Sequence, residues 1–289
     1  MRVAFARCAQ LPEIDPDEHL LLDAARSSGL DAHSINWDDP SHDPSPFDVV
    51  VLRATWNYHR EPEAFRAWLD STSRATTLLN PLDALEWNLD KTYLDELRER
   101  DVATIPTEFV KKTHTVELHR VLETNAWEEF VIKPLISGGS FRTQRFSVSQ
   151  IREASEFLDD LLLDRDAMVQ RYMPSVDTHG ERNIIVIDDR ITHTIRKNPR
   201  FAGDDEHISE AIAPSDEEVA FANRVLDALP DSLDRRELLY ARVDVMRDDD
   251  GGLVLSELEL LEPSLFFKQH PPALDRFING IVRRCQAAV

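Results

Sequence analysis

Carboxylates alternate with leucines in the segment LVLSELELLE, residues 253–262, near the C-terminal end of this sequence. If the segment is a β-strand, Glu257 and Glu259 point to one face while Leu258 and Leu260 point to the other. The leucines are apolar enough to bury their face of the strand. Acids on a largely buried strand need a cation to neutralise them, so this segment is a candidate site.

The preceding segment, LLYARVDVMR, alternates in the same way and is joined to the first by a DDDGG turn, which predicts a β-hairpin. With the turn centred between residues 250 and 251, Asp244 lies opposite Glu257 and Arg242 lies opposite Glu259. Side chains directly opposed in such a hairpin have Cβ atoms about 4.5–5.5 Å apart. Three carboxylates would therefore crowd together beside one arginine.

Crowded carboxylates repel one another unless a cation neutralises them. Oxygen ligands at this density suit Mg²⁺, which keeps part of its water shell and usually bridges to phosphate. The pattern therefore predicts a magnesium site at Asp244, Glu257 and Glu259. Taken alone, a solvated hairpin face with an ordinary Arg–Glu pair explains the same residues at least as well, because antiparallel sheets often expose one polar face.

A second group of residues, in the segment FVIKPLISGGSFRTQRF, suits phosphate binding. Lys133 ends a predicted strand and supplies a point charge. Adjacent glycines in the next loop let backbone N–H groups approach phosphate oxygens. The predicted phosphate loop consists of Ser137, Gly138, Gly139 and Ser140. An ordinary hairpin loop is the alternative, since neither GxxxxGK nor GxGxxG occurs in the chain.

The segment MVQRYMPSVDTHGERNIIVIDDRITHTIRKNPR could hold the rest of a nucleotide. The backbone of its first strand could contact an adenine edge; the residues concerned are Gln170, Arg171, Tyr172 and Met173. Glu181, at the start of the next strand, could accept a ribose hydroxyl. Arg196 and Lys197 belong to a cationic run, for which the alternative is a strand edge protected by charge.

The elements that would position these residues follow two patterns. Over the first 80 residues, predicted strands and helices alternate, which indicates an α/β layer with a mostly parallel sheet. From about residue 105, strands at hairpin spacings dominate, which indicates antiparallel α+β units. Helices in that part are expected near residues 115–124, 148–163, 214–229 and 271–287.

Three units follow from these patterns, with a linker near residues 80–83 where Pro81 breaks the periodicity. We predict an N-terminal α/β domain for substrate, a central α+β subdomain with a lid loop, and a C-terminal α+β subdomain with the metal site. Their boundaries are residues 1–80, 81–170 and 171–289.

The composition excludes several classes of partner. Lys+Arg 33 minus Asp+Glu 54 gives a formal charge of −21, and such a field repels nucleic acid and anionic lipid. No apolar stretch approaches the length of a membrane span, and the N-terminal segment lacks the pattern of a signal peptide. Cys8 and Cys285 have no metal-binding spacing and indicate reduced thiols. We therefore expect a cytoplasmic protein with no nucleic-acid or membrane partner.

The order of these segments resembles the ATP-grasp superfamily over most of the chain. Lys91 comes first, followed by Lys133 with its Gly/Ser loop, then QRYM, Glu181, the Arg-Lys pair, RVD and ELE. The resemblance implies an N-terminal α/β domain followed by two α+β subdomains that clasp ATP. GERNIIVID and RVDVMRDDDGGLVLSELELLEPS look similar to bacterial glutathione synthetases. VVLRATWNYHREPEAF, NPLDALEWNLDKTYL and PSVDTHGERNIIVI look closer to the ATP-grasp ligases that close D-cycloserine from O-ureido-D-serine.

The resemblance implies ATP and Mg²⁺ as cofactors and a ligase reaction. A substrate carboxylate attacks the γ-phosphate of ATP to give an acyl phosphate, and an amine-type nitrogen then displaces the phosphate. Glutathione synthetases have Asn as the last metal ligand, so Glu259 keeps an oxygen ligand but adds a charge. Arg242 would stabilise the transferring phosphoryl group or the tetrahedral intermediate. The implied phosphate-binding cations are Lys91, Lys133, and Arg196 or Lys197.

The substrate carboxylate is expected beyond the strand DVVVLR, because ligands in open α/β sheets bind at the carboxyl ends of strands. The candidate residues are Arg53, Thr55, Trp56 and Asn57, together with Ser264 after the second hairpin strand. A surface loop with a packed Trp56 is the alternative. Two other functions stay open, a kinase that phosphorylates a small molecule and an ATP-binding module without catalysis. The relatives named are commonly oligomeric, so the resemblance also suggests a homo-oligomer.

Overall fold

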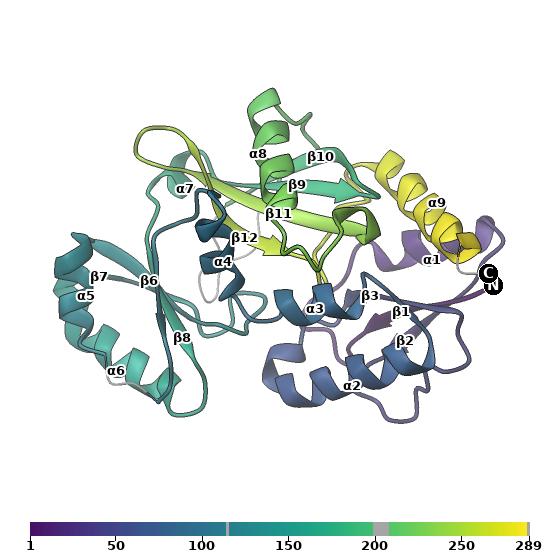
Figure 1. Ribbon diagram of the computed structural model, residues 1–289, viewed down its shortest axis with the longest axis horizontal. Coiled ribbons are helices and arrows are strands. Elements are labelled where there is room, and N and C mark those ends of the chain that lie inside the picture. Colours follow the sequence, from purple (N-terminus) through teal and green to yellow (C-terminus); the bar gives the residue numbers. More distant parts are fainter. Residues whose placement is uncertain (114–115, 199–207, 288–289) are drawn as a thin grey trace.

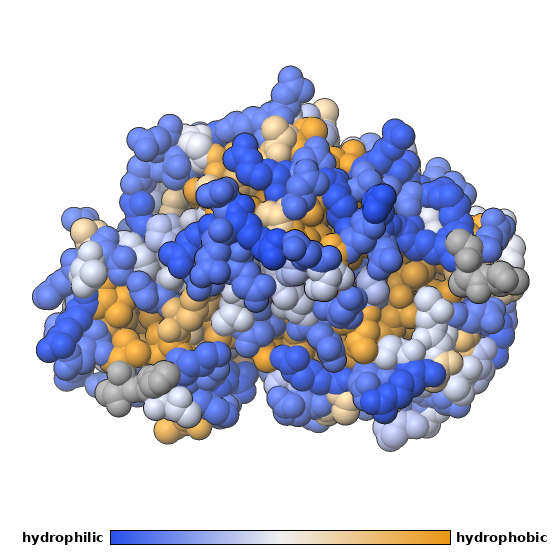
Figure 2. Space-filling model, in the orientation of Figure 1, coloured by the Kyte–Doolittle hydropathy of each residue, from blue (hydrophilic) through white to orange (hydrophobic). Residues whose placement is uncertain are grey.

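Three four-stranded sheets form the framework of the computed structural model, which describes residues 1–113, 116–198 and 208–287 (Figure 1). One sheet comes from the N-terminal part of the chain, one from the middle and one from the C-terminal part. Hydrophilic side chains cover most of the face shown in Figure 2, in keeping with the strongly acidic composition. Of the helices that the described residues form, none combines the length and the apolar character needed to cross a bilayer.

The N-terminal sheet is parallel throughout, in the order β2-β1-β3-β4. Its strands are β1 (Arg2–Arg7), β2 (Asp31–Asn36), β3 (Val49–Ala54) and β4 (Thr77–Leu79). The crossovers contain α1 (Glu18–Ser27), the 3₁₀ turn η1 (Tyr58–Arg60) and α2 (Pro62–Ala75). Every residue of β3 is buried, because the two faces of this strand belong to two different apolar cores. The predicted α/β layer is confirmed.

The C-terminal helix, α9 (Pro271–Ala287), returns to this N-terminal sheet. Phe277 and Ile281 share an apolar core with Val3 and Val51. The two chain ends consequently lie close together at one side of the molecule (Figure 1). The last segment of the sequence therefore stabilises the first.

The middle sheet is antiparallel, in the order β5-β8-β6-β7. Its strands are β5 (Thr107–Val110), β6 (Glu129–Pro134), β7 (Gln144–Ser147) and β8 (Ala167–Arg171). One 3₁₀ turn and two helices accompany it, η2 (Val148–Gln150), α5 (Leu118–Asn125) and α6 (Ile151–Leu162). Phe130, Phe146 and Leu158 form part of the core between this sheet and its helices.

The C-terminal sheet is also antiparallel, in the order β10-β9-β11-β12. Its strands are β9 (Glu181–Ile187), β10 (Arg190–Lys197), β11 (Tyr240–Arg247) and β12 (Leu253–Glu259). The remaining short elements are α7 (Ser175–Thr178), α8 (Asp216–Asp227) and η3 (Arg235–Glu237). Phe221 of α8 packs into the same core as Val243 and Leu258. The predicted combination of a parallel α/β layer with antiparallel α+β units is confirmed.

The segment after residue 80 forms two short helices separated by a break. These are α3 (Leu82–Asn88) and α4 (Tyr93–Glu99). Lys91 lies in the break, where its backbone N–H donates to Leu135 O at 3.2 Å. The break therefore places Lys91 beside the end of β6, which carries Lys133.

The segment predicted as a linker is a packed junction. Asn80 is fully buried, and its Nδ2 donates to Tyr240 O at 2.9 Å and to Leu260 O at 2.8 Å. Its Oδ1 accepts from Leu239 N at 2.7 Å. The end of β4 is thereby fixed to the ends of β11 and β12. The division into three units at residues 80 and 170 stays a prediction.

Candidate active site

A cavity of about 530 Å³ is lined by residues from all three parts of the chain. Strands β6 and β8 of the middle sheet contribute to one side, and β11 and β12 contribute to another. Loops that follow β1 and β3 of the N-terminal sheet complete the lining. The size suits a ligand as large as a nucleotide with a small second substrate.

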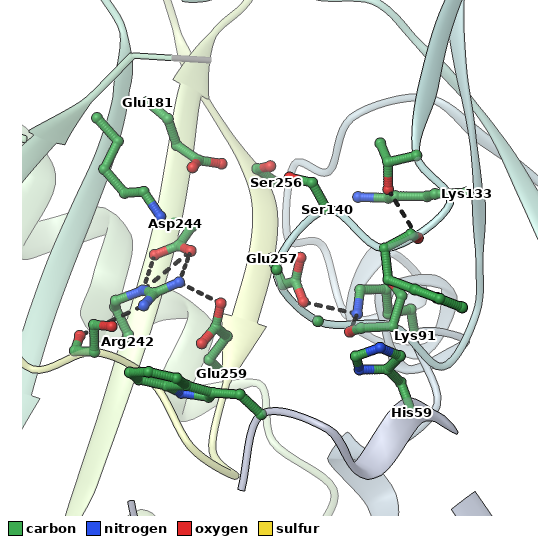
Figure 3. A pocket seen from close by; sticks show the side chains of 18 of the residues that line it. His59, Lys91, Lys133, Ser140, Glu181, Arg242, Asp244, Ser256, Glu257 and Glu259 are labelled. Atoms are coloured by element: carbon green, nitrogen blue, oxygen red, sulfur yellow. Dashed lines mark hydrogen bonds and ion pairs between the residues drawn. The ribbon is translucent and has the colours of Figure 1, made fainter. Parts of the chain in front are cut away.

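The predicted hairpin pairing is present at the wall of this cavity. Asp244 pairs with Glu257, and Arg242 pairs with Glu259. Figure 3 shows these four side chains together, with Glu257 between the hairpin and the lysines opposite. The two-residue alternation of the sequence therefore located the acids correctly.

A register shift near the turn explains why this pairing holds. Val245 pairs with Leu255 and Arg247 pairs with Leu253, so the turn is centred half a residue earlier than predicted. Ser256 is left as an extra residue in β12, and this bulge restores the predicted pairing farther along the hairpin. Ser256 also lines the cavity. Sequence reasoning missed it, because no residue type in the strand signals the bulge.

Arg242 holds two of the carboxylates. Its Nε lies 2.9 Å from Asp244 Oδ1 and its Nη2 lies 2.8 Å from Asp244 Oδ2, while Nη2 also pairs with Glu259. Burial opposes the charge of Arg242, but Asp244 and Glu259 outweigh it and raise the arginine pKa. Burial raises the pKa of Glu259 to about 7, with Asp244 and Glu257 adding to the effect against Arg242. The cluster is thus short of positive charge.

Lys91 holds the third carboxylate. Its Nζ lies 2.9 Å from Glu257 Oε1 and donates to Ser137 O at 2.8 Å. Burial alone would raise the pKa of Glu257, but Lys91 and Lys133 lower it, so this acid is charged. Burial lowers the pKa of Lys133, although Glu257 opposes the change. Both lysines predicted to bind phosphate therefore line the same cavity as the acids.

The three acids are suitable ligands for Mg²⁺, but their side chains are not arranged around a metal-binding position. In the part of the chain that the structure describes, no three acidic, histidine or cysteine side chains converge closely enough to hold one. Asp244 and Glu259 are turned toward Arg242, and Glu257 is turned toward Lys91. The donors still fit Mg²⁺, because all are carboxylate oxygens on one hairpin. Binding would require them to exchange protein partners for the ion.

The predicted adenine and ribose residues line the same cavity. Gln170, Arg171, Tyr172 and Met173 line it together with the apolar residues Ile105, Val131 and Met246. Glu181 also lines it and forms a hydrogen bond with the Ser256 hydroxyl. Burial, followed by the nearby Asp244, raises the pKa of Glu181. These positions are compatible with the predicted nucleotide contacts and leave them as predictions.

The Gly/Ser loop, Ser137 to Ser140, lies over the cavity and rests on the N-terminal part of the chain. The hydroxyl of Tyr58 donates to Ser137 O at 3.2 Å. Just beyond the loop, the ring of Phe141 lies 4.4 Å from the ring of His59, centroid to centroid. Gly139 has φ +57°, a conformation that favours glycine. All four loop residues line the cavity.

The two predicted catalytic cations of β10 have different positions. Lys197 lines the cavity, whereas Arg196 is absent from the described lining. Arg196 Nη2 donates to Thr178 O at 2.8 Å. A Cβ atom at Gly180 would approach Arg196 Cγ to 2.9 Å, so the arginine packs beneath that turn. Of the pair, Lys197 is therefore the one that borders the cavity.

The predicted substrate residues also divide into two groups. Trp56, Asn57 and Ser264 line the cavity, whereas Arg53 and Thr55 are not among its described lining residues. Arg53 and Thr55 are buried behind the wall. The split follows from β3, which is covered on both faces up to its last residue. Direct contact of Arg53 with substrate therefore does not follow from its position.

Glu262 is a buried cavity residue to which sequence reasoning gave no role. It is 8% exposed and follows β12 by three residues. Its backbone oxygen accepts from Trp56 Nε1 at 3.1 Å. Burial, with Glu259 adding to it, raises the pKa of Glu262 to about 8. Its position in an acid-rich, apolar segment was visible in the sequence. Its lack of a side-chain partner became apparent only from the three-dimensional structure.

Similarity to known proteins agrees with this geometry. Residues 3–80 match the family described as the N-terminal domain of D-cycloserine synthetase DcsG. The chain is 31% identical over 291 residues to the cycloserine biosynthesis protein DcsG of Streptomyces lavendulae, with 94% of each chain covered.

Two solved structures share the fold. The crystal structure of D-cycloserine synthetase DcsG matches with a TM-score of 0.90 and 29% identity, over 99% of this chain and 100% of that chain. The ATP-grasp ligase PsnB, complexed with minimal precursor, Mg and ADP, matches with a TM-score of 0.63 and 17% identity, over 98% and 97% of the two chains. This chain therefore belongs to the DcsG family of ATP-grasp ligases, enzymes that form C–N bonds.

Proposed function

We propose that this enzyme joins a carboxylate to an amine-type nitrogen through an acyl phosphate, on a small amino-acid-like substrate. The specific reaction proposed is closure of the D-cycloserine ring from O-ureido-D-serine. One observation carries the proposal: Lys91, Lys133 and Arg242 meet three carboxylates in a single cavity. Phosphoryl transfer needs such positioned charges and no protein nucleophile. Similarity to DcsG over nearly the whole chain supports the specific substrate.

ATP would lie along the cavity with its adenine between Ile105, Val131 and Met246 on one side and the segment from Gln170 to Met173, at the end of β8, on the other. Glu181 would accept a ribose hydroxyl. Lys91, Lys133 and Lys197 would then approach the phosphates from different elements of the fold. Each lysine acts as a point charge that neutralises phosphate oxygens.

The first step activates the substrate carboxylate. One of its oxygens attacks the γ-phosphorus of ATP, the bond between that phosphorus and the bridging oxygen breaks, and ADP leaves. Arg242 would stabilise charge on the transferring group. Asp244, Glu257 and Glu259 would hold Mg²⁺, which would neutralise phosphate charge.

The second step forms the C–N bond. A nitrogen attacks the acyl carbon, the carbon–oxygen bond to phosphate breaks, and phosphate leaves with the electron pair. In O-ureido-D-serine this nitrogen is the one bonded to the side-chain oxygen, so release of D-cycloserine also requires water to remove the carbamoyl group. The loop Ser137 to Ser140 would exclude water from the acyl phosphate before the ring closes.

A hydroxylamine trap tests the proposal. The enzyme is incubated with ATP, Mg²⁺ and O-ureido-D-serine or another small D- or L-amino acid, and hydroxylamine intercepts any acyl phosphate as a hydroxamate. We expect hydroxamate and ADP only with the true substrate, and D-cycloserine by mass spectrometry when O-ureido-D-serine is used without the trap. A stable phosphorylated product with no hydroxamate would instead identify a kinase.

A further inference from the structure

Glu262 is a buried acid that the reaction steps above do not use. It is 8% exposed, lines the cavity, and is held on the wall by the hydrogen bond from Trp56 to its backbone oxygen. No described residue forms a hydrogen bond or an ion pair with its carboxylate. A carboxylate removed from water without a partner costs free energy, so this position calls for an explanation.

The other acids gathered around the hairpin have partners within the protein. The pairs are Asp244 and Glu259 with Arg242, Glu257 with Lys91, and Glu181 with Ser256. Glu262 differs from them because no described side chain pairs with it, and its pKa is raised to about 8. Acids in a cleft whose pKa is strongly perturbed are candidates for ligand binding.

The space beside the Glu262 carboxylate is small and polar. A Cβ atom built on Gly138 would lie 3.7 Å from Glu262 Oε1 and 3.7 Å from His59 Nδ1, so both atoms lie near the side of Gly138 from which a side chain would project. His59 Nδ1 is buried and, among the described residues, has no hydrogen-bond partner. Two potential acceptors without partners therefore border the same recess.

The acidic side of this recess favours a cation, because burial, followed by the charge of Glu259, raises the pKa of Glu262 to about 8. The imidazole side is neutral. Burial, followed by the charges of Arg60 and Arg165, lowers the pKa of His59 to about 4. At neutral pH the imidazole is therefore uncharged and, with its proton on Nε2, can accept a hydrogen bond at Nδ1. A carboxylate and a neutral imidazole together suit a small donor with several N–H groups.

We propose that Glu262 binds the α-ammonium group of the substrate, with His59 Nδ1 as a second acceptor. This inference rests on the proposed ligase function and narrows its substrate to amino acids with a free amino group. Arg242 Nη1 lies 3.4 Å from the carbonyl oxygen of Ser264, two residues beyond Glu262. Arg242 and Glu262 line the same cavity, and the charge of Arg242 acts on the Glu262 carboxyl, so both can face one bound amino acid.

The test compares a substrate with its counterpart that lacks the amino group. O-ureido-D-serine and 3-(ureidooxy)propanoate are each supplied with ATP and Mg²⁺, and kcat/KM is measured from ADP release. Wild-type enzyme should prefer the amino compound by about 100-fold or more, because a buried polar site rejects an analogue that leaves it unpaired. Glu262→Gln keeps the volume but removes the charge, and should reduce that preference to about tenfold or less.

A matched control is Glu61→Gln, since Glu61 is exposed and adjoins the same 3₁₀ turn as His59. This variant should keep the wild-type preference. Because Glu262→Gln could also affect folding, its thermal unfolding and its KM for ATP are measured in parallel, and both should remain near wild-type values. His59→Gln should weaken the preference less than Glu262→Gln does.

The outcomes separate the inference from the function on which it rests. If wild-type enzyme accepts both compounds equally, or if Glu262→Gln keeps the full preference, Glu262 does not recognise an ammonium group. If wild-type enzyme releases ADP with neither compound, the proposed substrate is wrong and this inference is wrong with it. The latter result is distinguishable because ATP consumption itself is then absent.

Discussion

Lys91 Nζ lies 2.9 Å from Glu257 Oε1, which joins the break between α3 and α4 to the acidic face of β12. The lysine is 4% exposed and also donates to Ser137 O in the glycine loop. One buried cation thus contacts a predicted metal ligand and the predicted phosphate loop. Both partners are in place without ligand, so metal binding by Glu257 would require it to exchange Lys91 for the ion.

Removal of one acid should eliminate metal binding without unfolding the protein. Glu257→Gln and Asp244→Asn retain side-chain volume and remove one charge each. We expect ATP consumption to fall by at least about 1,000-fold, because a metal clamp contributes several kcal/mol to transition-state stabilisation. The readout independent of activity is the melting temperature, which Mg²⁺ with ADP should raise in wild type and not in either variant.

Glu237→Gln is the control for these two variants, since Glu237 is exposed and remote from the cavity lining. It should respond to Mg²⁺ and ADP as wild type does. A Glu257→Gln protein that still consumes ATP at a near wild-type rate would show that the metal has been assigned to the wrong acids.

The hairpin illustrates what could be predicted from sequence. Asp244 and Glu257 were paired correctly because side chains alternate along strands and because two offsets in the hairpin cancelled. The turn itself was placed half a residue late, and the bulge at Ser256 compensated for that error. When the turn is misplaced by half a residue, the predicted residue pairing is correct only if a bulge compensates. Residue types do not reveal where a bulge lies.

Residues that depend on distant segments were harder to assign. Arg53 and Trp56 were both predicted to contact substrate, from the rule that ligands bind beyond strand ends. Of the two, Trp56 alone is among the described lining residues of the cavity. Glu262 was assigned a role because Gly138 and His59 lie beside it, and both are more than 120 positions away in sequence. A single sequence cannot show that three such positions share one recess.

The glycine loop should be mobile without nucleotide and ordered with it. Residues 136–142 contain two glycines, and beyond the Ser137 anchor the loop region is held to the N-terminal part by the contact between Phe141 and His59. Hydrogen exchange of residues 136–142 should slow by about tenfold or more when a non-hydrolysable ATP analogue is bound. Equal exchange in both states would argue against a closing lid.

The ring contact itself can be tested in the same experiment. Phe141→Ala should speed loop exchange in the free enzyme by about fivefold, because an aromatic pair contributes on the order of 1 kcal/mol. Leu163→Ala is a suitable control, since Leu163 is 82% exposed. If Phe141→Ala and the control exchange alike, the ring contact does not hold the loop.

A second ion pair should control stability in acid. Glu218 Oε1 accepts from Arg182 Nε at 2.7 Å, and Glu218 Oε2 accepts from Ser215 N at 2.8 Å at the start of α8. Burial opposes the charge of Glu218, but Arg182 and the Ser215 hydrogen bonds outweigh it and lower its pKa from the ordinary value of 4.5. Because the folded pKa is the lower one, the stabilisation is complete above pH 4.5 and is lost as the pH falls through the folded value.

Urea unfolding of Glu218→Gln measures that contribution. At pH 7 the variant should be less stable than wild type by about 2–3 kcal/mol, since Arg182 loses a buried partner. The difference should shrink as the pH falls below 4.5. Glu217→Gln, one residue earlier and exposed, removes a surface pair with Arg247 and should cost less than about 1 kcal/mol. A difference for Glu218→Gln that is constant from pH 7 to pH 3 would contradict this assignment.

Arg53 should position the cavity-lining segment around Pro263 rather than contact the substrate directly. Its Nη2 donates to Pro263 O at 3.1 Å, and its guanidinium carbon lies 5.6 to 5.8 Å from the ring centroids of three aromatic residues. Pro263 lies between Glu262 and Ser264, which both line the cavity. Arg53→Ala should therefore lower the free energy of unfolding by about 3 kcal/mol, because it leaves a cavity and a freed carbonyl.

The kinetic consequence distinguishes a positioning role from direct contact. We expect Arg53→Ala to raise KM for O-ureido-D-serine far more than KM for ATP, because the 262–264 segment moves while the nucleotide end does not. Arg53→Lys can restore the hydrogen bond to Pro263 and should recover most of the lost stability and substrate affinity. If Arg53→Lys regains stability but keeps the full KM defect, the guanidinium itself reaches the substrate carboxylate, and the direct contact expected from the end of β3 is correct after all.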